Sequence, residues 1–64
     1  MRPLMEIMED ERMTMLRLES IDRQILRDSD PEVQDILFAQ RTKFKRKLES
    51  IRSEMKQYID ELNM

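Results

Sequence analysis

The most constraining feature of the sequence is the stretch from Leu37 to Leu62, in which apolar residues recur alternately four and three residues apart. This is the heptad spacing of an amphipathic helix that packs along one side, and no part of the stretch alternates as a β-strand would. The line runs through Leu37, Arg41, Phe44, Leu48, Ile51, Met55, Tyr58 and Leu62. Only Arg41 is not apolar, so the pattern predicts one long helix with a continuous packing stripe, which we call the seam.

A second amphipathic pattern precedes it, from Pro3 to Arg27. Proline suits the first turn of a helix, where its missing N–H costs nothing, so we expect a helix over 3–27. Its part of the seam consists of Leu4, Ile7, Leu18, Ile21 and Ile25, widened by Met8 and Met15 and interrupted by Glu11, Thr14 and Asp22. Two helices with matching apolar stripes predict that they pack on each other.

The one break between the helices is residues 28–30, followed by Pro31. Two starts of the next helix fit these residues: Asp30 as N-cap with Pro31 in the first position, or Ser29 and Glu32 as a capping box. Either way the second helix covers 31–63. Helices joined by so short a turn fold back antiparallel, so residues 1–64 are predicted to form a single all-α helical hairpin domain.

A hairpin of 64 residues has too little apolar material for a large core, and the chain contains neither Cys nor His for a disulfide or a structural zinc site. We therefore expect a homo-oligomer, a dimer that forms a four-helix bundle or antiparallel coiled coil. With the turn centred on Ser29, Pro3 reaches only to about Met55. Tyr58, Ile59 and Leu62 are then expected to extend beyond the first helix and to need another chain.

Several apolar residues lie off the seam and indicate contacts with protein. Met5, Met13 and Leu16 lie on other sides of the first helix, and Phe38 points away from the seam of the second. Burial inside a four-helix bundle and contact with a different protein both account for them, since flexible Met side chains suit adaptable surfaces. The candidate protein-interaction residues are Met5, Met13, Leu16, Phe38, Tyr58, Ile59 and Leu62.

A basic stripe on the second helix gives a competing hypothesis. Arg41, Lys45, Arg52 and Lys56 fall along one side of that helix, with Phe38 at the end of the line. Such a stripe can follow phosphates while an aromatic ring stacks on a base, as in RNA or DNA binding. The alternative is a solvated, partly paired face, because Glu49 lies beside the stripe and Glu11 is expected to face Lys47.

The residue inventory argues against catalysis. Without His, Cys or Gly there is no usual base, thiol nucleophile or glycine-rich phosphate loop, so we expect no enzyme activity and no cofactor. The run Asp28-x-Asp30-x-Glu32 has the spacing of a calcium loop, but Pro31 and the missing glycine spoil its geometry. The methionines are better explained as core residues than as ligands of a soft metal, so no metal site is expected.

Net charge and hydropathy set the expected surroundings. The net charge of −2 gives no overall attraction to nucleic acid or anionic membranes, and no apolar run reaches the length of a membrane span. The N-terminal stretch turns acidic before a signal-peptide core could form, and cysteine is absent. We expect a soluble, cytoplasmic protein that does not associate with membranes.

Two resemblances are partial. The segment 16–26 resembles the opening helix of the all-helical chorismate mutases, which carry Ile-Asp pairs after a Leu-Arg, but the spacing of Leu16-Arg17 and Ile21-Asp22 differs and no catalytic residue carries over. In length and turn position the hairpin is similar to the small RNA-binding hairpin dimer Rop, without a shared motif. The leading expectation is a non-enzymatic interaction module, a regulator, inhibitor or accessory subunit. Nucleic-acid binding is the alternative.

Overall fold

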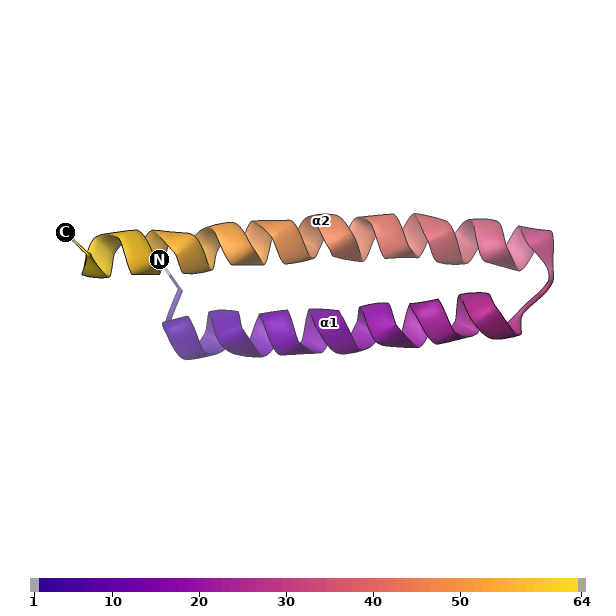
Figure 1. Cartoon of the computed structure of the whole chain (residues 1–64), viewed down its shortest axis with the longest axis horizontal. Helices are drawn as coiled ribbons and strands as arrows, with labels where there is room; N and C mark the ends of the chain where they lie inside the picture. Colours follow the sequence, from indigo (N-terminus) through magenta and orange to yellow (C-terminus); the bar gives the residue numbers. More distant parts are fainter. Residues whose placement is uncertain (1, 64) are drawn as a thin grey trace.

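The computed structural model describes residues 2–63, which form two antiparallel α-helices joined by a short turn (Figure 1). Helix α1 spans Leu4–Arg27 and helix α2 spans Pro31–Leu62. The molecule is a rod of 51 × 15 × 15 Å, and α2 extends beyond the start of α1 at the end where both chain ends lie. The predicted all-α helical hairpin is confirmed, and the helix ends differ from the expected ones by at most one residue.

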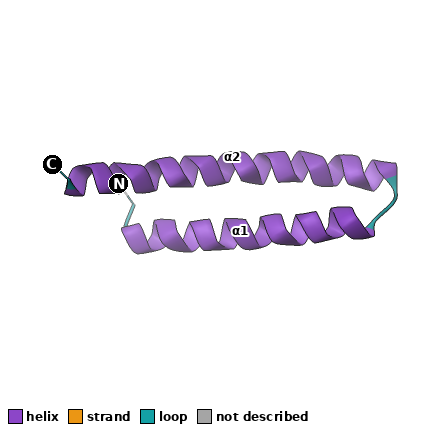
Figure 2. Ribbon diagram, viewed as in Figure 1, coloured by secondary structure: helices purple, strands orange, loops and turns teal. Residues whose placement is uncertain are grey.

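The turn between the helices is the teal segment that joins α1 to α2 in Figure 2, and aspartate side chains hold it. The Oδ1 atom of Asp28 accepts a hydrogen bond from the backbone N–H of Asp30 at 2.9 Å, and Oδ1 of Asp30 accepts from the N–H of Glu32 at 3.0 Å. Gln34 of α2 donates its side-chain N–H to the carbonyl of Asp28 at 2.7 Å. Of the two predicted helix starts, the one with Asp30 as N-cap and Pro31 in the first turn is found.

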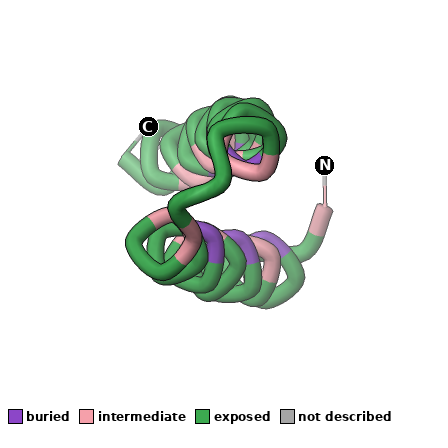
Figure 3. The backbone as a smooth tube through the Cα atoms, turned by 90° about the vertical axis from the view of Figure 1, so that its right-hand side faces the viewer, coloured by how far each residue is buried: buried purple, intermediate pink, exposed green. Residues whose placement is uncertain are grey.

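The seam lies between the two helices and supplies the core. In Figure 3 the buried positions of each helix lie on the side that faces the other helix. These buried residues are Ile7, Thr14 and Ile21 of α1 and Leu37 and Ile51 of α2. Arg41, Phe44, Leu48, Met55 and Tyr58 are partly buried on the same line, whereas Leu62 at its end is 80 % exposed. The predicted seam of α2 is therefore present up to Tyr58.

Thr14 does not interrupt the seam, contrary to the expectation from the sequence. Its residue is only 2 % exposed, and it lies one heptad from both Ile7 and Ile21, which are also buried. Its methyl group can pack as a small apolar group, and no buried side-chain N or O atom within residues 2–63 lacks a hydrogen-bond partner. The seam of α1 therefore continues through Thr14.

The core is small compared with the apolar surface that remains outside it. Among residues 2–63, four apolar residues are buried, whereas a longer set of large apolar residues is exposed. The exposed set is Leu4, Met5, Met8, Met13, Met15, Leu16, Leu26, Ile36, Phe38, Ile59 and Leu62. How these side chains are distributed around the rod determines what the molecule can bind.

Candidate protein-interaction surface

Two ion pairs cross from α1 to α2 on one side of the seam. Arg41 Nε donates to Oδ1 of Asp22 at 2.9 Å, and Arg52 Nε lies 3.6 Å from Oε2 of Glu11. Arg41 and Arg52 are about three helical turns apart and project to the same side of α2. The two pairs therefore mark one long side of the hairpin.

Four apolar side chains share that side with Lys45. Met8 and Met15 precede Asp22 by whole heptads, and Phe38 and Ile59 are whole heptads from Arg52, so they share the sides that these charged residues define. Each of the four is between 45 and 56 % exposed. We call Met8, Met15, Phe38 and Ile59 the apolar flank.

Two surface hollows support this placement. One is lined by Asp22, Ile25, Leu26, Phe38 and Arg41, which brings Phe38 of α2 together with the end of α1. The other is lined by Met5, Met8, Glu9 and Arg12 near the start of α1. The apolar flank is therefore hollowed near both ends of the rod.

The opposite side of the seam is polar. The guanidinium of Arg17 lies 5.6 Å from the ring centroid of Phe44, and Arg17 lines a hollow with Gln24 and Gln40. Asp10 and Glu54 lie on this side at heptad spacing from Arg17 and Gln40. We call Asp10, Arg17, Gln24, Gln40 and Glu54 the polar flank.

Arg2 lies at one end of the polar flank. This is the end of the hairpin opposite the turn, and we call it the open end. The Arg2 guanidinium donates to Glu54 through Nη2 at 2.9 Å and Nε at 3.1 Å, and also to Asp10. Because the guanidinium donates these hydrogen bonds to the Glu54 and Asp10 carboxylates, the pKa of Arg2 is raised above its usual value. The hydroxyl of Tyr58 donates to the backbone carbonyl of Arg2. Tyr58 was expected to extend beyond the first helix and to need another chain. It has a partner within its own chain, because Arg2, which precedes α1, lies beside it.

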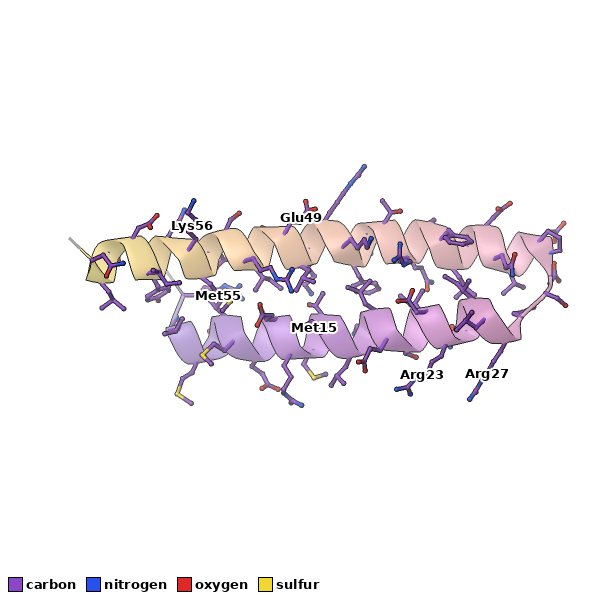
Figure 4. All side chains as sticks on the ribbon, in the orientation of Figure 1. Met15, Arg23, Arg27, Glu49, Met55 and Lys56 are labelled. Atoms are coloured by element: carbon purple, nitrogen blue, oxygen red, sulfur yellow. The ribbon has the colours of Figure 1, made fainter. Side chains whose placement is uncertain are left out.

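Ile59 and Leu62 are exposed at this end, 56 % and 80 %, as expected of residues beyond the start of α1. Met5, Met13 and Leu16 are also exposed, and they lie on the parts of α1 that face away from the seam. Arg23 and Arg27 point away from α2 in the same view in which Met55 lies between the helices (Figure 4). The predicted interaction residues therefore divide between the apolar flank, the outer side of α1 and the open end.

The basic stripe is partly neutralised within the hairpin. Two of its residues, Arg41 and Arg52, form the ion pairs with Asp22 and Glu11. The predicted contact of Glu11 with Lys47 is wrong: Lys47 lies one heptad from Gln40, which places it on the polar flank, on the other side of the seam. Lys45 and Lys56 remain exposed, so nucleic-acid binding stays a prediction that requires a strongly salt-dependent affinity lost when all four stripe residues become Gln.

An exposed ion pair lies beside the apolar flank on α1. Arg12 Nη2 is 2.6 Å from Oε1 of Glu9. Hydrogen bonding and charge attraction from Arg12 lower the pKa of Glu9, and the same contact raises the pKa of Arg12. The pair fixes the position of the Arg12 side chain near Met8.

Within residues 2–63, acidic side chains do not gather in groups of three that could hold a metal ion. Neither described helix is long and apolar enough to cross a membrane.

The contacts that Arg2 makes and the difference between the two flanks were not predicted from the sequence. Arg2 precedes α1, where periodicity gives no information about a side chain. The flanks were present in the sequence as heptad positions, but which side of α1 meets which side of α2 follows only once the two antiparallel helices are packed. Comparisons of the chain with protein families, curated proteins and solved structures find no match.

Proposed function

We propose that this chain is a small, non-enzymatic interaction module that self-associates as a dimer and acts by presenting helix faces to another protein, as a regulator, inhibitor or accessory subunit. The observation that carries this proposal is the apolar flank, where four large apolar side chains line one side of a rod whose opposite side is polar. Such asymmetry is typical of a surface that another chain covers. The absence of cysteine further supports a cytoplasmic location.

The size of the core supports the same proposal. In the described part of the chain, four apolar side chains and Thr14 are buried, which leaves the isolated hairpin with little to offset the conformational entropy of ordering the chain. Covering half-exposed residues such as Phe38 and Met15 adds apolar burial without any change in the hairpin itself. Self-association therefore completes a core that the single chain leaves small.

Solution mass and thermal unfolding test the self-association. Sedimentation equilibrium at micromolar concentration is expected to give twice the chain mass, and the melting temperature is expected to rise with protein concentration, because association stabilises the folded state by mass action. A well-folded monomer whose melting temperature does not depend on concentration would refute this part of the proposal.

The outer side of α1 is where a different protein is proposed to bind. Met13 and Leu16 lie there, 44 % and 47 % exposed, away from both flanks. Affinity capture from the native host with the unmodified chain and with a Leu16→Glu bait tests this. A partner retained by the first bait and lost from the second supports the proposal, and a partner retained equally by both contradicts it.

A further inference from the structure

The apolar flank has an internal symmetry that identifies what covers it. Met8 and Met15 are equally spaced about the level of Glu11 and Arg12 on α1, and Phe38 and Ile59 are equally spaced about the level of Leu48 and Glu49 on α2. Those two levels lie at the same height along the rod, because Arg17 contacts Phe44 on one side of them and Arg2 contacts Tyr58 on the other. The four residues of the apolar flank are therefore arranged symmetrically about one line across the hairpin.

We infer that the apolar flank is the dimer interface and that a second copy of this chain covers it about a two-fold axis on that line, with the two turns at opposite ends of the dimer. This inference rests on the proposed self-association and adds its surface, its occupant and its geometry. A two-fold axis across the rod places Met8 opposite Met15 of the partner subunit and Phe38 opposite Ile59 of the partner subunit. An interface of this kind is self-complementary, as two-fold dimers require.

The charged residues near the axis form one favourable and one unfavourable contact in this arrangement. Lys45 lies on the flank between Phe38 and the axis, and Glu49 lies beside the axis one turn further along α2. Glu49 projects from the outer edge of α2 and is exposed (Figure 4). Across the axis, Glu49 comes within about one turn of Lys45 of the partner subunit, and the symmetry forms this contact twice. The same axis places Lys45 opposite Arg52 of the partner subunit, and Glu11, 3.6 Å from Arg52 Nε in each chain, offsets that second positive charge.

Apolar pairing distinguishes this arrangement from the other two-fold dimer that uses the same flank. If the axis ran along the rod, with both turns at one end, Met8 would face Arg52 of the partner subunit and Met15 would face its Lys45. Apolar side chains would then cover charged groups that must stay hydrated. The crosswise axis instead joins apolar residues to apolar residues at both ends of the flank.

Two methionines of equal exposure give a matched test of the surface. Met15 on the apolar flank is 45 % exposed, and Met13 on the outer side of α1 is 44 % exposed. Met15→Glu is expected to raise the dimer dissociation constant on the order of 100-fold, because it places two carboxylates in the symmetric interface, whereas Met13→Glu is expected to change it by less than about threefold. Circular dichroism at a concentration where each variant is fully helical checks that both fold.

The outcomes separate this inference from the proposed function. A dimer that tolerates Met15→Glu as well as Met13→Glu overturns the interface but leaves self-association standing. An unmodified chain that is monomeric overturns both.

Disulfide trapping tests the axis, since the chain has no cysteine of its own. In Met8→Cys/Met15→Cys the two thiols of one chain are about 10 Å apart along α1 and cannot bridge, so every disulfide joins two chains. This variant is expected to give a covalent dimer within minutes of mild oxidation, at least 10-fold faster than Met15→Cys/Lys45→Cys. Faster covalent dimerisation of the latter variant would overturn the crosswise axis in favour of the lengthwise one.

Discussion

The two flanks of the hairpin border the same seam but differ in how their side chains are satisfied. On the polar flank, Arg17 lies over Phe44, and Glu54 binds Arg2. These side chains therefore have their partners within the same chain. On the apolar flank, Met15 and Phe38 remain about half exposed, with charged neighbours that already pair across the seam. The difference shows that a short helical hairpin can be complete on one side and incomplete on the other, although both sides follow one heptad pattern.

The seam is expected to support both flanks equally, and its disruption gives the largest effect. Ile51, 3 % exposed, packs between the helices, and Ile51→Ala removes buried methyl groups and leaves a cavity. We expect a loss of about 2 to 5 kcal/mol in the free energy of unfolding, measured by urea denaturation. Both the dimer and the Arg2 contacts should weaken with it. Loss of the dimer without loss of the Arg2 contacts, or the reverse, would show that the two flanks do not depend on the same core.

The polar flank is expected to stabilise the open end without contributing to association. Tyr58→Phe removes the hydrogen bond to the carbonyl of Arg2 and keeps the ring on the seam. The expected cost is about 1 kcal/mol, appearing as faster amide hydrogen exchange in the first turns of α1. Solution mass should not change. A variant that dissociates the dimer would show that the polar flank takes part in the interface.

The ion pairs that cross between the helices beside the apolar flank are expected to contribute little to folding. Asp22 and Arg41 have side chains that are 52 % and 35 % exposed. A double-mutant cycle with Asp22→Asn and Arg41→Gln should give a coupling energy of about 0.5 kcal/mol that decreases with added salt. This value applies to the dissociated chain. Where the dimer forms, the covering chain is expected to desolvate the pair and raise the coupling energy, and a coupling energy that does not rise would contradict that arrangement.

The smallest expected effect concerns pH, at the pair beside the apolar flank. Arg12 lowers the pKa of Glu9 below its ordinary value of 4.5, so the folded state favours the ionised carboxylate. The stabilisation is complete above the unfolded pKa and is lost as pH falls through the lower folded pKa. NMR titration should show the pKa of Glu9 returning toward 4.5 in Arg12→Gln. An unchanged pKa in that variant would show that Arg12 does not act on Glu9 in solution.

Much of the hairpin follows from the sequence because heptad spacing and turn chemistry are local signals. The seam of α2 could be predicted directly, and the start of α2 could be reduced to two candidates, of which the Asp30 cap is found, since each signal depends on residues close in the chain. The partner of Glu11 could not, because the turn position gives the height of a residue along the rod but not its side. Lys47 has the expected height, and Arg52 lies on the required side. The contacts of Arg2 could not be predicted either, because Arg2 lies outside both helices and helical periodicity gives no information about its side chain.

The position of the chain ends has a mechanical consequence. Both ends of the described chain lie at the open end of the hairpin, and the turn lies at the far end (Figure 1). A force that pulls the two ends apart therefore breaks the contacts between the helices one after another. The first to break are the contacts of Arg2 to Glu54 and Tyr58. Such unzipping needs far less force than sliding the two helices past each other. Under tension the hairpin would open as a soft, reversible extension, and a covering chain would share that load.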